Sequence, residues 1–235
     1  MISLSKMKTH ALERITGAVK NSYGFVYGFH KAKGHTQYPS ADSFARMLID
    51  LNKCVAPKLY VMDGIVAMEG NGPGSGDPVP MNVLLMSTDP VALDSVFSRL
   101  VYLKPEMVPT NYHGEKMGLG TWKEEEITLL TPDGEISMAE AVKKYGNPAF
   151  NVDRTEVRKN IWTRMAGALN IFQKKPYIEA DKCFRCGICV QSCPVPGKAV
   201  DFRKGKGKPP VYDYRKCIRC FCCQEMCPKK AIKVK

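Results

Sequence analysis

Two cysteine runs with the same spacing constrain this chain more than any other feature of its sequence. Each run has the pattern C-x2-C-x2-C-x3-C, and a proline follows each run, at Pro194 and at Pro228. Together the runs hold eight of the ten cysteines in the chain. Their members are Cys183, Cys186, Cys189 and Cys193 in the first run, and Cys217, Cys220, Cys223 and Cys227 in the second.

This spacing is typical of iron–sulfur clusters, which are held by cysteine thiolates. Thiolates three residues apart in a tight loop point at one centre, and the backbone amides between them can donate hydrogen bonds to the sulfurs. Two zinc sites are the alternative. Zinc sites usually use two separated C-x2-C pairs, which does not predict the longer x3 step and the proline twice. The sequence therefore predicts two [4Fe-4S] clusters and an electron-transfer function.

The repeat resembles the bacterial two-cluster ferredoxin, because an extended stretch precedes and follows each cysteine run. In that family the first three cysteines of a run bind one cluster and the fourth binds the other. The resemblance implies that one cluster is bound by Cys183, Cys186, Cys189 and Cys227, and the other by Cys217, Cys220, Cys223 and Cys193. Cys222 is left over, and we expect it to be a small buried side chain.

The basic charge of the chain is concentrated in the same region. The net charge is +12, of which residues 176–235 carry +9. A basic tail can indicate nucleic-acid binding, but a cluster with four thiolates carries about −2, so two clusters offset about four of these charges. No nucleic-acid-binding motif accompanies them. We therefore expect no nucleic-acid partner, and interpret the basic loop at residues 195–210 as solvated or as a dock for an acidic redox partner protein.

Cellular location is predicted from what the sequence lacks. No stretch reaches the roughly 18 apolar residues of a membrane span. The first residues have no apolar core of a secretory signal. In a reducing compartment, ten cysteines are better explained by metal binding than by disulfides. We expect a cytoplasmic protein with no membrane partner, and the oligomeric state stays open.

Strands and helices alternate through residues 1–150, which predicts an α/β layer fold. An amphipathic linker helix is expected within residues 151–175, at 154–172, and residues 176–235 form a small α+β ferredoxin-like domain with two iron–sulfur clusters. In the first domain we expect strands at 1–5, 58–63, 81–87 and 127–130, helices at 11–20 and 40–54 and after Asp89 and Ser137, and loops at 23–38 and 70–80.

Five motifs in this first domain, in order, resemble the domain of unknown function 362 family. They are KMKTH at residues 6–10, VKNSYG at 19–24, PKLYVMDG at 57–64, MEGNGP at 68–73 and TDPVALD at 88–94. Members of this family are often fused to ferredoxin-type modules, so the resemblance implies a redox setting, but not a defined activity. Members usually have a substantial segment before the KTH motif, and this chain begins almost on it. Either the protein is a shortened version, or its start was misassigned, or a partner chain supplies the missing half.

Several polar residues of the first domain are candidates for a catalytic site. Lys8, His10 and Lys20, with His30 and His35, gather cations and imidazoles near the N-terminus. Carboxylates come from Asp63, expected at a strand end, and Glu69, expected at a loop start, and the carboxyl ends of strands are where α/β folds form their sites. Such a set could bind an anionic small molecule, bind a metal or transfer protons. Each residue also has a purely structural interpretation. Asp89 and Asp94 are expected to be helix-capping and surface residues.

The glycines at positions 70, 72, 74 and 76 follow a predicted strand but do not form a nucleotide-binding motif. The spacing is not G-x-G-x-x-G, no Gly-Lys-Ser/Thr follows, and the next element is a strand. A flexible loop or a backbone site for an anion remains open.

Two functions are compatible with the sequence as a whole. One is an oxidoreductase that passes electrons through the clusters to a substrate or cofactor in the α/β domain. The other is a non-catalytic electron-transfer subunit of a larger redox complex.

Overall fold

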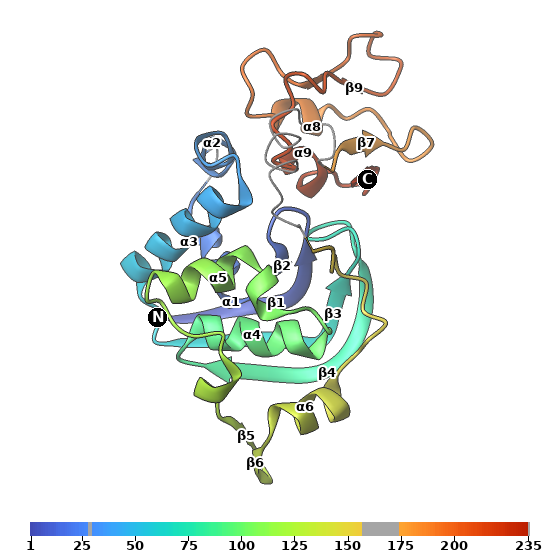
Figure 1. Ribbon diagram of the computed structural model, residues 1–235. Coiled ribbons are helices and arrows are strands. Elements are labelled where there is room, and N and C mark those ends of the chain that lie inside the picture. The colour runs from blue at the N-terminus through green and yellow to red at the C-terminus, as the bar shows by residue number, and fades with distance from the viewer. Residues whose placement is uncertain (28–29, 157–173, 235) are drawn as a thin grey trace.

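The computed structural model describes residues 1–27, 30–156 and 174–234. These residues form an α/β domain and a smaller cysteine-rich domain, which lies beyond one end of the α/β sheet (Figure 1). The predicted fold class, an α/β domain followed by a small α+β ferredoxin-like domain, is confirmed.

A sheet with the strand order β2-β1-β3-β4 forms the centre of the α/β domain. β1 is parallel to β3, whereas β2 and β4 are antiparallel to their neighbours. The strands are β1 (Ile2–His10), β2 (Arg14–Thr16), β3 (Leu59–Glu69) and β4 (Asp77–Ser87). Three of these strands were predicted, but too short. β3 and β4 pair as far as Glu69 and Asp77. The first residues of β4, from Asp77, therefore lie in the segment that was predicted to be a loop at 70–80.

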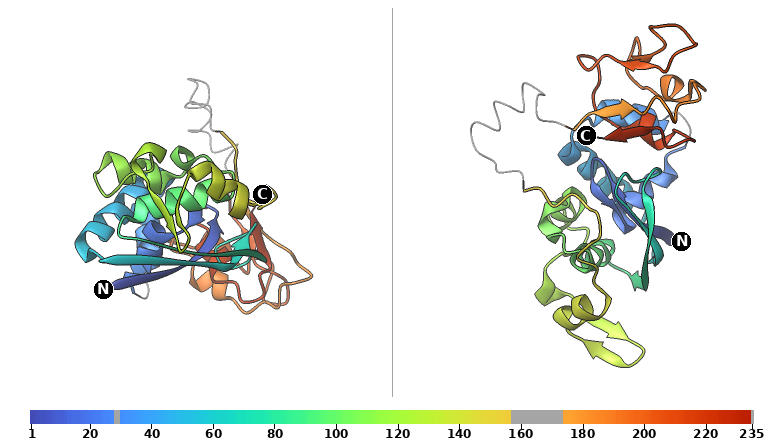
Figure 2. Two further views of the ribbon diagram at one scale, coloured as in Figure 1. Left: turned by 90° about the horizontal axis from the view of Figure 1, so that it is seen from below. Right: turned by 90° about the vertical axis from the view of Figure 1, so that its right-hand side faces the viewer.

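Helices cover one face of this sheet (Figure 2). α3 (Ala41–Val55) begins after Ser40, whose hydroxyl accepts a hydrogen bond from the N–H of Ser43. α4 (Pro90–Leu100) begins after Asp89, whose carboxylate accepts hydrogen bonds from two N–H groups of its first turn. Both helix starts agree with the sequence. The other helices of this layer are α1 (Ala18–Asn21), the short η1 (Ser22–Phe25) and η2 (Pro105–Met107), and α5 (Pro109–Lys116).

Two groups of buried side chains hold the helices in place. Met7, Met62 and Phe97 belong to the group between the sheet and α4. Phe44 and Leu48 belong to the second group, between α3, α1 and the start of α4. All five side chains are fully buried. Burying each of them stabilises the fold by about 1.5–3 kcal/mol, which fixes α1 and α3 against the sheet.

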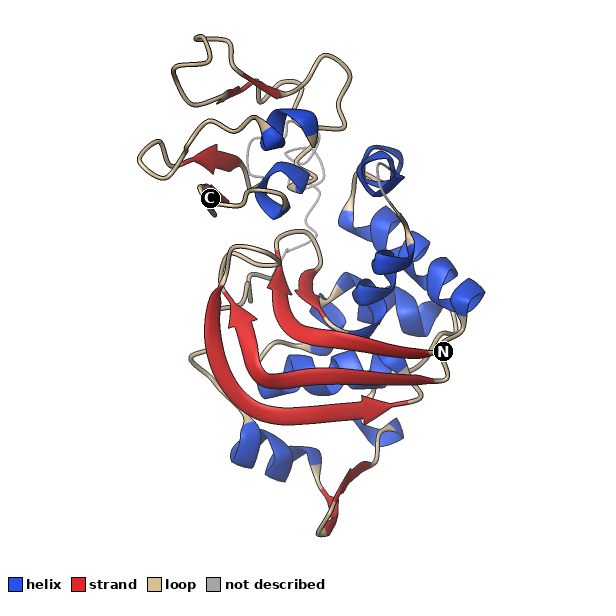
Figure 3. Ribbon diagram, turned by 180° about the vertical axis from the view of Figure 1, so that it is seen from behind, coloured by secondary structure: helices blue, strands red, loops and turns tan. Residues whose placement is uncertain are grey.

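The opposite face of the sheet carries exposed apolar side chains. Leu4, Ile65, Leu84 and Met86 are all more than half exposed. Figure 3 looks onto this face, and no helix of the described residues covers the strands there. This face is therefore an apolar surface without a partner within the described chain.

Two expectations for the first 40 residues are wrong. Residues 11–20 form a turn, β2 and α1 rather than one helix. Ile15 and Val19 are spaced as on a helix, but they enter different buried groups, so the apolar periodicity reflects two separate contacts. The region expected as a loop at 23–38 contains α2 (His30–Gln37). It is held by tertiary contacts that composition does not reveal, such as the His35 ring stacked 4.4 Å from the ring of Phe44.

The α/β domain ends with a hairpin and a helix, preceded by the short η3 (Glu124–Glu126). β5 (Leu129–Thr131) and β6 (Gly134–Ile136) pair across the predicted turn, and α6 (Met138–Tyr145) begins with the predicted capping box of Ser137 and Glu140. The linker helix predicted at 154–172 lies outside the described residues from position 157 on, and residues 154–156 are not helical. No helix in the described part of the chain is long and apolar enough to cross a membrane.

The cysteine-rich domain repeats one unit, as the sequence predicts. Each unit has an extended segment, a cysteine run with a short helix, and another extended segment. β7 pairs with β10, and β8 pairs with β9. The elements are β7 (Pro176–Ile178), α8 (Ile188–Gln191), β8 (Val200–Asp201), β9 (Val211–Tyr212), α9 (Cys222–Glu225) and β10 (Ile232–Val234).

Candidate functional site

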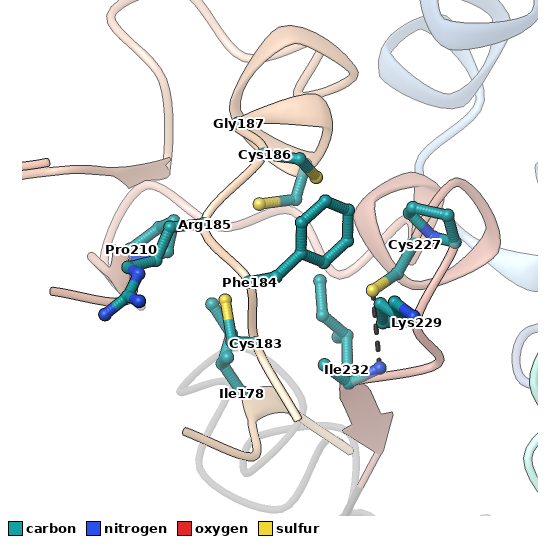
Figure 4. A pocket seen from close by; sticks show the side chains of 13 residues that line it. Ile178, Cys183, Phe184, Arg185, Cys186, Gly187, Pro210, Cys227, Lys229 and Ile232 are labelled. Carbon is teal, nitrogen blue, oxygen red and sulfur yellow. Dashed lines mark hydrogen bonds between the residues drawn. The ribbon is translucent and has the colours of Figure 1, made fainter. Parts of the chain in front are cut away.

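The cysteines of the two runs line two separate cavities, and each cavity takes three cysteines from one run and one from the other. Figure 4 shows the first cavity, where Cys183 and Cys186 face Cys227 across the ring of Phe184. The first cavity is lined by Cys183, Cys186, Cys189 and Cys227, and the second by Cys193, Cys217, Cys220 and Cys223. This crossed grouping is the one that the ferredoxin resemblance implies.

The surroundings of these cysteines supply thiols and backbone N–H donors, which are the groups that hold an iron–sulfur cluster. All ten cysteines of the chain are free thiols. The backbone N–H of Ala231 donates to Cys227 Sγ at 3.3 Å, and the N–H of Ala199 donates to Cys193 Sγ at the same distance. Burial, followed by the charges of Cys183 and Cys186, raises the pKa of Cys189 to about 11. Cys189 is therefore a neutral thiol at pH 7 in the absence of a metal, and a thiolate here requires a positive metal core beside it.

Cys222 is buried, as expected, but it does not point into plain core. It begins α9 and lines a third cavity, described below. A hydrogen bond with Cys220, together with burial, raises the pKa of Cys222 above its ordinary value. Cys222 is therefore a neutral thiol beside a predicted cluster ligand.

The glycine-rich loop at residues 70–76 receives the cysteine-rich domain. The fully buried Gln224 of α9 donates from Nε2 to the carbonyl oxygens of Asn71 and Gly72, at 2.8 and 3.0 Å. Asn71 donates back to the Ile232 carbonyl at 3.1 Å. A Cβ on Gly74 would lie only 3.1 Å from the Glu225 carbonyl oxygen. Gly74 thus offers bare backbone to α9, whereas a Cβ on Gly72 or Gly76 would meet the carbonyl oxygen of Thr9 or Glu69 within the α/β domain.

His10 links the same two domains. Its Nδ1 accepts hydrogen bonds from the N–H groups of Leu12 and Glu13, so the proton lies on Nε2, which donates to Glu225 Oε1 at 3.1 Å. Burial and the charge of Lys20 lower the pKa of His10 to about 4, and the ring is neutral at pH 7. Burial raises the pKa of Glu225, but the hydrogen bond from His10 and the charge of Lys20 outweigh it and bring the pKa to about 2.

A cavity of about 610 Å³ lies between the α/β domain and the helices α8 and α9. Lys8 and Lys20, two of the predicted site residues, both line it. Burial and then the charge of Lys20 lower the pKa of Lys8, so the two ammonium groups repel each other. The other lining residues of the α/β domain are Thr16, Asn21, Tyr23, Gly24, Lys31 and His35, and those of the cysteine-rich domain are Ile188, Gln191, Ser192, Cys222, Glu225 and Met226.

The cysteine-rich wall of this cavity is built from residues next to cluster ligands. Ile188 and Met226 each precede a cysteine of the first cluster cavity, at 189 and 227. Ser192 and Cys222 each precede a cysteine of the second, at 193 and 223. A molecule in the interdomain cavity therefore contacts residues adjacent to ligands of both predicted clusters.

Asp63 and Glu69 are not brought to this cavity. The prediction that Asp63 ends a strand is wrong, because β3 continues to Glu69. Asp63 pairs with Lys6 at 2.6 Å on the surface and accepts the N–H of Ile65 where β3 bends. Glu69 accepts the N–H of Asn151 at 2.7 Å. Both carboxylates therefore support the fold.

Asp94 is also placed differently from the expectation of a surface residue. It is fully buried and accepts hydrogen bonds from the N–H groups of Ala18 and Val19, at 2.5 and 3.1 Å. Burial raises its pKa to about 7, despite these two hydrogen bonds. By receiving the start of α1, Asp94 fixes the helix that presents Lys20. Asp94 is the last residue of the TDPVALD motif, which could have marked it as important. Its partners Ala18 and Val19 lie more than 70 residues away, so the sequence did not show its role.

Comparison with known proteins agrees with the two sequence resemblances. A family model described as Domain of unknown function (DUF362) matches residues 1–99, and a model described as 4Fe-4S dicluster domain matches residues 175–228. The curated "Thylakoid-associated protein sll1697" of Synechocystis sp. is 42% identical over 120 residues, covering 51% of this chain and 37% of that protein. The chain thus aligns with less than half the length of this relative. No solved structure gives a significant match.

Proposed function

We propose that this chain, which joins a DUF362 domain to a 4Fe-4S dicluster domain, is an oxidoreductase that exchanges electrons with a small molecule in the interdomain cavity. The observation that carries the proposal is the wall of that cavity, in which Ile188, Ser192, Cys222 and Met226 each adjoin a cluster cysteine. A molecule that contacts these residues is one residue away from a cluster ligand, so electron transfer between them needs no further carrier. The predicted site residues Lys8 and Lys20 form the opposite wall.

We propose two [4Fe-4S] clusters with the crossed ligand sets, one on Cys183, Cys186, Cys189 and Cys227 and one on Cys217, Cys220, Cys223 and Cys193. Each cluster, when bound, accepts and releases one electron. Two reduced clusters would supply two electrons to a bound substrate, which would take up two protons from water. This chain's residues bind and orient that substrate.

A redox partner protein supplies the electrons in this proposal. The basic loop at residues 195–210 supports docking of an acidic partner, because Arg203, Lys204, Lys206 and Lys208 are exposed on it. We also propose a cytoplasmic location, supported by the free state of all ten cysteines.

A non-catalytic electron-transfer subunit is the second candidate. The exposed apolar face of the sheet, with Leu4, Leu84 and Met86, favours it, because large exposed apolar surfaces mark protein interfaces. In that case the clusters serve a partner, and the interdomain cavity has no part in electron transfer.

Blocking the cavity distinguishes the two candidates. Gly24 lines the cavity, and a Cβ added there meets no atom within 4 Å, so Gly24→Trp places a bulky side chain at the cavity wall with room for its Cβ. Gly207→Trp is the matched control, because Gly207 also has open space but lies in the exposed loop of the cysteine-rich domain.

The measurement is the anaerobic reoxidation of the reduced clusters by a small-molecule filtrate of the producing cells, followed by visible absorbance. We expect fast reoxidation of the unmodified protein and of Gly207→Trp, and slow reoxidation of Gly24→Trp. Equal rates for all three proteins would support the subunit instead. Iron analysis of each protein, with about eight atoms expected per chain, controls for cluster content.

A further inference from the structure

The charges that line the interdomain cavity are unbalanced. Lys8, Lys20 and Lys31 contribute three ammonium groups. Glu225 is the only acidic residue of the lining, and His10 already donates to it. Within the described residues, no ion pair or hydrogen bond engages any of the three ammonium groups. The cavity therefore presents free positive charge to whatever enters it.

Two buried polar atoms of the cavity wall also have no partner. Thr16 is 2% exposed and His35 is 3% exposed, yet neither Thr16 Oγ1 nor His35 Nδ1 forms a hydrogen bond in the described structure. A buried polar atom without a partner destabilises the structure that holds it. Both residues line the cavity, so a ligand there can supply the missing partners.

The imidazole of His35 is held rigidly for such a role. It stacks on the ring of Phe44 at 4.4 Å and meets the edge of the Tyr23 ring at 5.6 Å. The Tyr23 hydroxyl is fixed in turn, because it donates to the Lys31 carbonyl at 2.6 Å. Burial lowers the pKa of His35 to about 4, so the ring offers a neutral nitrogen beside the lysine charges.

We infer that the cavity binds its ligand through an oxyanion, a carboxylate or a phosphate, which Lys8 and Lys20 hold and which accepts hydrogen bonds from the Thr16 hydroxyl and from the N–H at His35 Nδ1. Lysine ammonium groups and hydroxyls are the usual partners of such oxygens, and their hydrogen bonds to a charged acceptor are about twice as strong as neutral ones. The inference rests on the proposed function, since it names the substrate class of that same cavity. It also explains why two lysines that repel each other line the same cavity.

Binding is tested on the anaerobically purified full-length protein with its clusters in place. Isothermal titration calorimetry uses inorganic phosphate in one arm and malonate in the other, which distinguishes the two sources of the oxyanion. We expect at least one of them to bind at a single site. Lys8→Ala/Lys20→Ala should weaken that binding at least tenfold, and Thr16→Val, which removes one hydroxyl and keeps the shape, should weaken it about fivefold.

Lys6→Ala/Lys58→Ala is the matched control, because it removes the same charge from exposed positions outside the cavity. It should leave the affinity within twofold. The inference is wrong if neither anion binds, or if the cavity and control variants weaken binding equally. It is also wrong if Gly24→Trp blocks reoxidation while neither anion slows reoxidation of the unmodified protein, and the proposed function then still stands. If Gly24→Trp reoxidises normally, the proposed function falls, and the titrations decide the anion site by themselves.

Discussion

Glu13 allows a sharp test of the electrostatics near the domain contact. Its side chain is fully buried between β1 and β2, and neither carboxyl oxygen has a hydrogen-bond partner in the described structure. Burial raises its pKa well above the ordinary 4.5, the charge of Lys20 opposes this shift, and Asp42 adds to it. Burial without a hydrogen-bond partner therefore favours the protonated form of this carboxyl group in the folded protein.

The pH dependence follows from this raised pKa. The stability linked to Glu13 is fully present below pH 4.5 and is lost as the pH rises toward the pKa in the folded state, because the unfolded chain releases the proton first. The loss is about 1.4 kcal/mol per pH unit. Glu13→Gln keeps the size of the side chain and cannot ionise. We expect the variant to gain stability over the unmodified protein by that amount per unit above pH 4.5.

Native-state hydrogen exchange measures this difference without stripping the clusters. Opening free energies are compared for the amides of β1 and β2 between about pH 5 and pH 7, after correction for the intrinsic exchange rate. Glu135→Gln, on the exposed β6, controls for the loss of one carboxyl group. A Glu13→Gln variant that is less stable at pH 7, or a difference that does not change with pH, would refute the reasoning, since Glu13 would then be ionised and paired.

Three further predictions concern the domain contact and the surface. Gln224→Glu replaces the donor to the Asn71 and Gly72 carbonyls with a third acceptor, and should weaken the contact between the two domains by about 2–4 kcal/mol. The measurement is hydrogen exchange, which should become faster in residues 70–76 while the iron content stays unchanged. Gly72→Ala would bring a Cβ to 2.1 Å from the Thr9 carbonyl oxygen, so this variant should have a clearly lower melting temperature. Gly118→Ala is the control, because its Cβ meets no neighbour and the variant costs only the strain of a positive φ. Asp63→Asn removes an exposed ion pair with Lys6. It should change the free energy of unfolding by less than about 1 kcal/mol and leave the reoxidation rate of the clusters unchanged. A large loss of electron transfer would make Asp63 a catalytic candidate again.

Local patterns were sufficient wherever a few neighbouring residues decide the structure. The cysteine repeat predicted two units with an extended segment on each side of the cysteine run, because ligands that share a centre must sit at fixed steps along the chain, and the structure shows that these segments pair between the units. Ser40, Asp89 and Ser137 predicted three helix starts, because a capping side chain bonds only to the first turn of its own helix.

The same patterns failed where distant residues decide. Residues 11–20 had helical periodicity, but Asp94 receives the start of α1 from across the domain and shortens the helix. Asp63 was predicted to be a site carboxylate at a strand end, but the pairing of β3 with β4 continues beyond it, so it lies within the strand. Neither partner lies near in the sequence, so no local pattern contains the information.

The sequence by itself determined that this chain holds two cysteine runs suited to two iron–sulfur clusters, and that Lys8, His10 and Lys20 are chemically equipped for a site. Only the tertiary structure decided their roles. Where α9 packs on the glycine-rich loop, His10 donates a hydrogen bond from one domain to the other, and Lys8 and Lys20 line a cavity with residues that precede cysteines of both runs. The physical reason is that the cavity belongs to neither domain alone and forms only where their surfaces meet.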